Sequence, residues 1–527
     1  MTQSNDTGRI QRIVIVGGGT AGWLAAGMLA SKLPSSSKVS LIESPNVSTI
    51  GVGEGSWPSL RDTLIDIGID EKAFITTCHA SYKQGSSFVN WRKPSTDEHI
   101  YYHPFTVPTA YNELNIHACW QTLAKNDAYQ DAFSLQAAMC KAGKAPKQEN
   151  TPDYAHVLNY GYHFDATALA NLLKQHCIEK RNVSYVQAHI GQVKNDDDGF
   201  ISALVTDKGE EIAGDLFIDC SGQQGILIGK HFNVPWISVE NTLINNRAVA
   251  IQVPYSDSDN AIASTTVATA QSTGWTWDIG LQHRRGVGLV YADGMISEAQ
   301  ATDTLLAHVS KRYDADKTAC KVKDLRFSPG YREQFWVKNC LSLGMSSGFV
   351  EPLEASAIAM VELGLRMLCE AFPHNHQHMS TLSNRYNARF TYRWQRVIDF
   401  LKLHYVLSDR EEPYWLAQRD PETIPDSLAE LLDIWRYQSP SRLDFIENEE
   451  IFPSASYQYV LYGMGYETAM PATRLTHDSV VKAKDIRNKM QQMQQAYLNG
   501  LPSNRALLAQ ISAHFNKDDS YAAIGFR

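Results

Sequence analysis

The chain has 527 residues, which is long enough for one large α/β enzyme or two closely joined domains. Hydrophobic residues make up 43% and charged residues 20%, as in ordinary globular proteins, and this composition excludes long disorder and the collagen-like and disulfide-dense classes. The net charge of −9, without a basic block, argues against a nucleic-acid-binding protein.

The eight cysteines show no C-x-x-C spacing, so the sequence predicts neither a metal site nor a redox dithiol. The first residues are polar, and no run approaches the ~18 apolar residues of a membrane span. The sequence therefore predicts a cytoplasmic protein that does not bind a membrane.

Residues 12–30 read as a strand, a glycine-rich turn and a helix. Gly17, Gly19 and Gly22 fit G-x-G-x-x-G, in which backbone amides approach a pyrophosphate at the start of the helix. A second strand, 39–42, ends in Glu43, at the spacing at which an acidic side chain reaches a ribose hydroxyl. An acidic residue here disfavours a 2′-phosphate, which leaves FAD or NAD.

Later segments favour FAD over NAD. Residues 48–58 form a second glycine-rich loop soon after Glu43, as expected of a backbone clamp on a large cofactor. Residues 215–225 and 340–348 each read as a strand that runs into glycine. An NAD domain normally completes in one continuous block, so three such junctions predict a discontinuous cofactor domain, as in FAD monooxygenases.

The remaining patterns complete the predicted architecture. An amphipathic helix is expected over 161–173 with Asp165 as its N-cap, a hairpin around the turn 195–199, and β-rich segments at 248–253 and 275–291. From about Pro352 the pattern is mostly helical. The sequence predicts an α/β fold, with a discontinuous FAD-binding domain over 1–370 that carries β-rich substrate-side insertions, and a mostly helical substrate domain over 371–527.

The segment GWTWDIGL at 274–281 is similar to the W-x-W-x-I-P signature of flavin-dependent halogenases, the tryptophan halogenase family, with Gly280 in place of proline. Other motifs resemble the family in the same order, up to about Gly465: GGGTAGW at 17–23, GVGE at 51–54, FVNW at 88–91, YHPF at 102–105, YHFDA at 162–166, SSGFVEPLEAS at 346–356 and DFLKLHY at 399–405. The resemblance implies a Rossmann-like monooxygenase/halogenase fold.

The resemblance also implies an activity: FADH2, delivered by a separate flavin reductase, reacts with O2 and halide to give hypohalous acid, which halogenates a small aromatic substrate. A homodimer is left open. The motif and the resemblance together place the FAD contacts at Gly17, Gly19, Thr20, Ala21, Gly22, Glu43, Gly53, Val193, Met345 and Ile358.

The halide, chloride or bromide, needs a small electropositive pocket, which backbone amides can supply without an oxidisable cation. The resemblance places these amides at Ser356 and Ala357. Family members often have Ser-Thr-Gly after the glutamate where this chain has Ala355-Ser356-Ala357, so the preference between the two halides is left open.

Two residues are implied to be catalytic. Lys83 matches the lysine that positions hypohalous acid, either as a hydrogen-bond donor or as an amine that becomes an N-halo species, and both roles stay open. Glu354 matches the carboxylate that stabilises the charged ring and accepts its proton. Glu351 competes for this role, because two acids three residues apart could share one helical face.

The substrate needs flat apolar walls, and the resemblance assigns one to His103 and Phe105. Trp275 and Trp277 resemble the wall that separates substrate from flavin. The C-terminal region shows no aligned set of partners for the charged groups of free tryptophan. Within the indole and tryptophan class, we therefore expect indole or another electron-rich arene to be the better substrate.

Two alternatives to a halogenase remain at this point. An FAD-dependent aromatic hydroxylase would share the fold but transfer oxygen directly to the substrate. A flavin-binding homologue without halogenase activity is conceivable because of Gly280 and Ala357.

Overall fold

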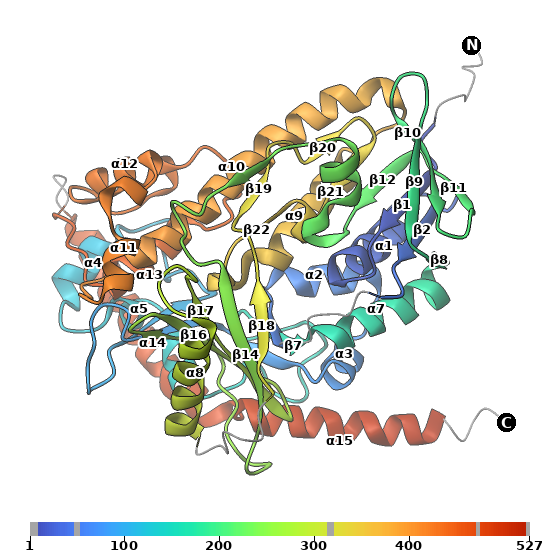
Figure 1. The fold of residues 1–527 in the computed structure, drawn as a ribbon. Helices are drawn as coiled ribbons and strands as arrows, with labels where there is room; N and C mark the ends of the chain where they lie inside the picture. The colour runs from blue at the N-terminus through green and yellow to red at the C-terminus, as the bar shows by residue number, and fades with distance from the viewer. Residues whose placement is uncertain (1–8, 47–52, 314–320, 471–474, 523–527) are drawn as a thin grey trace.

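The computed structural model describes residues 9–46, 53–313, 321–470 and 475–522. A six-stranded sheet holds the N-terminal glycine turn, in the order β20-β21-β12-β1-β2-β8 (Figure 1). The pairs from β21 to β8 are parallel, and β20 is antiparallel at the edge. The strands are β1 Arg12–Val16, β2 Lys38–Glu43, β8 Ser184–Gln187, β12 Leu216–Asp219, β20 Trp336–Val337 and β21 Cys340–Ser342.

β-branched residues explain the centre of this sheet. In β1 the run Ile13 to Val16 is buried, which is typical of a parallel strand covered on both faces. Strands β1, β12 and β21 come from three distant parts of the chain and lie side by side. The separate strand-to-glycine junctions of the sequence thus meet in one α/β sheet. Helix α1 (Thr20–Lys32) packs on β1 and β2 and contacts α7 (Ala166–Arg181) and α9 (Ser356–Glu370).

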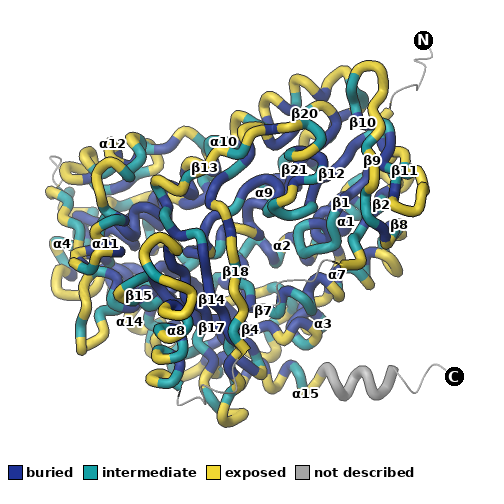
Figure 2. Tube along the Cα trace, viewed as in Figure 1, coloured by how far each residue is buried: buried dark blue, intermediate teal, exposed yellow. Residues whose placement is uncertain are grey.

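A seven-stranded sheet, β18-β14-β17-β16-β15-β5-β6, is antiparallel except for the pair β15 and β5. Its strands are β5 Gly85–Val89, β6 Ile100–Pro104, β14 Arg247–Pro254, β15 Thr266–Gln271, β16 Gly274–Gly280, β17 Arg284–Tyr291 and β18 Lys323–Arg326. All of β16 is buried, so both tryptophans of the GWTWDIGL segment lie inside the protein. Figure 2 shows its partner strand β17 mostly in the dark blue of buried residues. Helix α8 (Glu298–Tyr313) packs on β14 and β17.

Three small three-stranded sheets accompany the two large ones. They are β3-β7-β4 (Gly53–Gly55, Gly161–Asp165, Ser81–Lys83), β11-β10-β9 (Glu211–Ala213, Ile201–Thr206, Ile190–Asn195) and β13-β19-β22 (Trp236–Ser238, Gly330–Arg332, Gly348–Phe349). Strands β9 and β10 confirm the predicted hairpin around 195–199. The helix predicted over 161–173 is wrong in its first part, because residues 161–165 pair with β3 and β4, and α7 begins at Ala166 with Asp165 as its N-cap.

The chain after residue 352 is mostly helical, as predicted. Helix α10 (Met379–Val406) crosses the upper part of the molecule in Figure 1, α13 (Ser454–Gly463) packs on β6, and α15 (Asn504–Ala522) packs beside α3. The other helices are α2 Ser59–Ile67, α3 Glu71–Thr77, α4 Ile116–Leu123, α5 Tyr129–Ala132, α6 Gln136–Lys141, α11 Pro413–Gln418, α12 Asp426–Trp435 and α14 His477–Gly500. Within the described ranges, no helix is long and apolar enough to cross a membrane.

Candidate active site

The glycine turn after β1 has the shape that a dinucleotide requires. Gly17 has φ +119°, and a Cβ there would clash with the carbonyl of Cys220 at the end of β12. A Cβ on Gly19 would meet no atom within 4 Å, so the backbone is open to a ligand at this point. Helix α1 begins at Thr20 without a side-chain cap and without an acid in its first turn. Its first amides are therefore available to an anion, and the turn fits the pyrophosphate of FAD.

Glu43 ends β2 beside this turn. Its carboxylate lies against Gly18, where the space for a Cβ is already taken by Glu43 atoms. Its Oε2 accepts hydrogen bonds from Lys174 Nζ at 2.7 Å and from the Tyr185 hydroxyl at 2.8 Å. The carboxylate is thus fixed beside the turn, as the binding of a ribose hydroxyl requires.

Two residues expected near the flavin ring lie close to the same turn. Met345 belongs to a short turn at Gly344–Ser346, and a Cβ on Gly344 would lie 2.8 Å from Cβ of Ala21 in α1. Ile358 lies on α9, which packs against that short turn. The two residues therefore occupy the side of the cofactor turn that faces α9.

The other two expected FAD contacts lie farther along the chain. Gly53 belongs to β3, and a Cβ on this glycine would lie 3.0 Å from Cγ2 of Ile279 in β16. Residues 48–52 of its loop are outside the described residues. Val193 lies on β9 in a different sheet and packs against the hydrophobic cluster that contains Val14 and Ile42. Its contact with FAD stays a prediction.

Lys83 is the last residue of β4, and its ammonium is completely buried. Among the described residues, its Nζ has no hydrogen-bond partner, and it lies 5.3 Å from the centroid of the Phe105 ring. Burial lowers the pKa of Lys83 to about 8, although the negative charge of Glu354 acts in the opposite direction. The buried donor is therefore available to a ligand.

The turn before α9 sets the direction of Glu354. Glu354 has φ +64° and Ala355 has φ +54°, two consecutive non-glycine residues in the left-handed region. Such backbone is costly and is found mainly where a site requires it. Because the turn interrupts the helix, Glu351 and Glu354 do not share a helical face, and this part of the sequence prediction is wrong.

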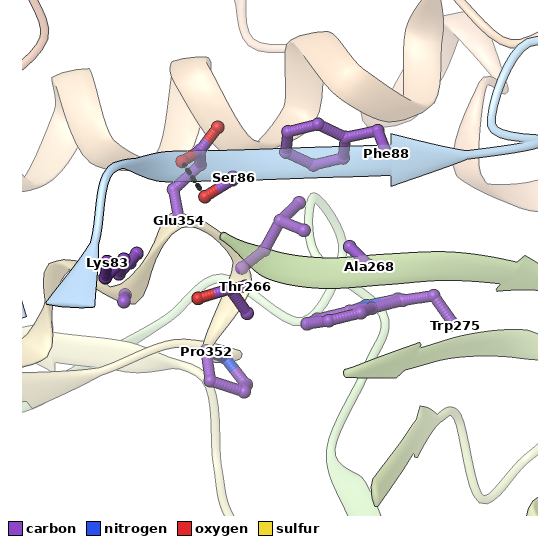
Figure 3. Close-up of a pocket in the computed structure, with 10 residues that line it drawn as sticks. Lys83, Ser86, Phe88, Thr266, Ala268, Trp275, Pro352 and Glu354 are labelled. Carbon is purple, nitrogen blue, oxygen red and sulfur yellow. Dashed lines mark hydrogen bonds between the residues drawn. The ribbon is translucent and has the colours of Figure 1, made fainter. Parts of the chain in front are cut away.

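The Glu354 carboxylate is held by three side chains from three elements. Oε1 lies 2.8 Å from Nδ1 of His103 and 3.3 Å from Nε2 of His404. Oε2 accepts a hydrogen bond from the Ser86 hydroxyl at 3.0 Å, the dashed line in Figure 3. Ser86 and His103 face each other across β5 and β6. His404 comes from α10, so the C-terminal helices complete the site.

The two histidines beside Glu354 keep its carboxylate ionised. Nδ1 of His404 lies 2.8 Å from the carbonyl oxygen of Phe400, which can only accept, so Nδ1 carries a proton. Burial acts to raise the pKa of Glu354, but His103 and His404 outweigh burial and hold that pKa below its ordinary value. Glu354 is therefore an ionised, oriented carboxylate.

Glu351 belongs to a separate buried network. Its Oε2 accepts hydrogen bonds from Asn245 Nδ2 at 2.5 Å, Trp275 Nε1 at 2.9 Å and the Tyr405 hydroxyl at 2.8 Å. Burial raises the pKa of Glu351, although these three donors oppose the rise. The network fixes the Trp275 ring and directs Glu351 away from Glu354.

Lys83 and Glu354 line the same small cavity. Its volume of about 10 Å³ has room for about one water-sized group. Lys83, Ser86 and Glu354 line it, and Trp275 and Pro352 close it (Figure 3). The predicted halide residues Ser356 and Ala357 are the first two residues of α9, directly after the lining residue Ala355.

A cluster of aromatic rings lies next to His103, which holds the Glu354 carboxylate. Phe400 stacks on Phe452 with ring centroids 3.8 Å apart, and Phe452 meets Trp57 edge-on at 4.9 Å. His103 lies beside Phe400 with centroids 5.6 Å apart. His103 therefore belongs both to this cluster of aromatic rings and to the side chains that hold the carboxylate, and its contact with a substrate stays a prediction.

Comparison with known proteins identifies the family of this chain. Residues 12–478 match the family model described as tryptophan halogenase. The chain is 32% identical to the tryptophan 6-halogenase ThaL of Streptomyces albogriseolus over 95% of this chain and 99% of that protein. The crystal structure of a tryptophan halogenase from Shewanella frigidimarina superposes with a TM-score of 0.92 at 43% identity, over 96% of this chain and 98% of that chain. BrvH, a flavin-dependent halogenase from Brevundimonas sp. BAL3, gives a TM-score of 0.82 at 30% identity, over 95% and 99% of the chains.

The chain belongs to the tryptophan halogenase family. The resemblance drawn from the motifs, the α/β fold class and the assignment as a flavin-dependent halogenase are confirmed. Four side chains around Glu354 were not predicted as site residues: Ser86, His404, Trp57 and Phe452. His404 lies in the DFLKLHY motif and Trp57 in the second glycine-rich loop, but neither segment indicates a role for the side chain.

Proposed function

We propose that this family member halogenates an electron-rich arene with hypohalous acid held by Lys83. The observation that carries the proposal is the pairing of two opposite charges at one small cavity. The buried Lys83 ammonium lacks a partner among the described residues, and the ionised Glu354 carboxylate lines the same cavity. Each group matches one demand of electrophilic substitution, a donor to the oxidant and an acceptor for the ring proton.

Reduced FAD, supplied by a separate flavin reductase, would provide hypohalous acid from O2 and halide. The residues proposed to hold FAD are those of the glycine turn, Glu43, Gly53, Met345 and Ile358, and the backbone amides of Ser356 and Ala357 are proposed to hold the halide. The open amides at the start of α1 and the fixed Glu43 carboxylate support the first assignment.

At the substrate, the Lys83 ammonium donates a hydrogen bond to the oxygen of hypohalous acid. The halogen–oxygen bond breaks as the carbon–halogen bond forms, and the leaving oxygen takes a proton from Lys83 and departs as water. Glu354 accepts the proton that the ring loses, and transfer of that proton back to Lys83 restores both groups. The balance is one arene and one hypohalous acid to one haloarene and one water.

Trp275 supports halogenation rather than direct hydroxylation. Its indole closes the cavity that Lys83 lines, and its N–H is fixed by Glu351. A hydroxylase would need its substrate beside the flavin, whereas a wall at this position requires a small oxidant to travel. The product mass distinguishes the two reactions, since halogenation depends on added halide and hydroxylation does not.

The test of this function is also a prediction about the substrate. The enzyme is incubated with flavin reductase, FAD, NADH and either chloride or bromide, and the products from indole, phenols and free tryptophan are measured by mass spectrometry. We expect halogenated indole, or another halogenated electron-rich arene, in larger yield than halogenated tryptophan, with bromide at least as effective as chloride. The rings of Phe400, Phe452 and Trp57 near Glu354 suit an uncharged aromatic molecule. Regioselective chlorination of tryptophan with indole as a poor substrate would contradict this expectation.

The pKa of Lys83 predicts the pH dependence. Burial lowers it to about 8, so the ammonium predominates at neutral pH and is lost as the pH rises through that value. If the ammonium donates to hypohalous acid, kcat measured from pH 6 to 9.5 should fall above about pH 8 while flavin oxidation in the same buffers serves as the control. A rise in kcat through pH 8 would instead indicate that the neutral amine reacts and forms an N-halo species.

A further inference from the structure

Trp57 brings an indole of the protein itself to Glu354. It lies near the end of the second glycine-rich loop, just before α2, and is only partly buried. Its Nε1 donates a hydrogen bond of 2.7 Å to the backbone carbonyl of Glu354, the residue whose carboxylate is the proposed proton acceptor. An indole N–H is a donor only, so this bond has one possible direction.

The ring of Trp57 also completes an aromatic wall. It meets Phe452 edge-on with ring centroids 4.9 Å apart, and Phe452 stacks on Phe400, which neighbours both His103 and His404. The wall therefore joins three distant segments: the cofactor-side loop, α10 and the start of α13. Aromatic contacts of this kind give a well-defined surface for a flat ring.

The carbonyl of Glu354 is the polar acceptor that this wall presents beside the carboxylate. A substrate ring that approaches Glu354 would meet this oxygen with the Trp57 N–H already bonded to it. Bonding of a substrate N–H would require displacement of the Trp57 ring and loss of an existing hydrogen bond. The substrate N–H thus adds little to binding while Trp57 is in place.

We propose that Trp57 is a specificity-determining residue, because it occupies the carbonyl acceptor of Glu354 with its own indole and so makes the site select substrates by ring shape and electron density rather than by a ring N–H. The inference rests on the proposed halogenase function and extends it to the substrate class. The enzyme should accept N-alkylated indoles and alkoxyarenes as readily as rings that carry an N–H.

The test compares indole with 1-methylindole in the wild type and in Trp57→Phe. Phenylalanine keeps an aromatic contact with Phe452 but cannot donate, so the Glu354 carbonyl becomes free for a substrate N–H. The ratio of kcat/KM for indole to that for 1-methylindole should rise by about fivefold to tenfold in Trp57→Phe, as expected when one hydrogen bond is gained. The intrinsic reactivity of each ring is the same in both enzymes, so it cancels when the two ratios are compared. Extra space in the variant would favour 1-methylindole and would therefore lower the ratio.

Trp120→Phe is the matched control. Trp120 is also partly buried and donates from Nε1 to a backbone carbonyl, that of Asp127, at 3.0 Å. The ratio should not change in this variant.

An unchanged or lower ratio in Trp57→Phe would overturn the inference. If Trp57→Phe binds both indoles but does not halogenate them, the ratio of their dissociation constants replaces the ratio of kcat/KM, and the same change relative to the wild type decides the test. Absence of halogenation in the wild type would contradict the proposed function instead.

Discussion

Replacement of Lys83 by methionine or alanine should reduce halogenated product by more than about 100-fold, the scale expected for loss of a positioned proton-transfer group. Methionine keeps the length of the side chain but removes the donor, so hypohalous acid would no longer be held beside Glu354. Product is measured by mass spectrometry, and FAD affinity and circular dichroism are measured on the same samples. We expect both of these to stay near the wild-type values.

Stability should move in the opposite direction from activity. A shift of the Lys83 pKa from 10.5 to about 8 corresponds to about 3 kcal/mol of unfavourable burial at neutral pH. The folded pKa lies below the unfolded one, so this cost is present below about pH 8 and disappears as the pH rises to 10.5. Lys83→Met removes the unpaired ammonium, and its Tm at pH 7 should equal or exceed that of the wild type.

Lys402→Met is the matched control for loss of a buried lysine. Lys402 is completely buried, and burial lowers its pKa to about 8, but its Nζ donates to the carbonyl of Thr242 and to the hydroxyl of Thr423. This variant should lose stability and keep halogenation. Near-wild-type halogenation by Lys83→Met, or equal loss of activity in the two variants, would remove Lys83 from the mechanism.

The sequence was sufficient for the parts of the fold that depend on local pattern. The run Ile13 to Val16 followed by Gly17 predicts a buried strand and a tight turn whatever the rest of the chain does, and the structure agrees. The segment 161–165 failed because its pattern is compatible with a helical turn, and only pairing with β3 and β4 makes it a strand. Such long-range pairing has no local signal.

The site shows the same limit at the level of side chains. Lys83 and Glu354 were predicted through motifs, but nothing in the chain order indicates that His404, 50 residues after Glu354, holds its carboxylate. Trp57 was likewise seen only as part of a glycine-rich loop. Its role depends on one hydrogen bond to a backbone carbonyl 297 residues away, which spacing cannot predict.

Glu354→Gln should lower kcat by roughly 10²- to 10⁴-fold, the range for a positioned acid–base group, with little change in flavin affinity. The amide can fit the same place, because its oxygen can accept from His103 while its NH2 donates to the Ser86 oxygen. The variant should therefore fold and still bind substrate. A neutral amide cannot accept the ring proton, however, so the substitution step should slow.

Glu351→Gln separates this role from the general loss of a buried carboxylate. Its Oε2 accepts three hydrogen bonds, from Asn245, Trp275 and Tyr405, which a neutral amide cannot reproduce. This change should lower Tm and loosen the Trp275 wall, with a smaller effect on kcat than Glu354→Gln. Single-turnover measurements with preformed hypohalous acid would isolate the substitution step in both variants. A larger loss in Glu351→Gln in that experiment would mean that the proton acceptor is Glu351, and that the two histidines around Glu354 serve the fold of the turn rather than the reaction.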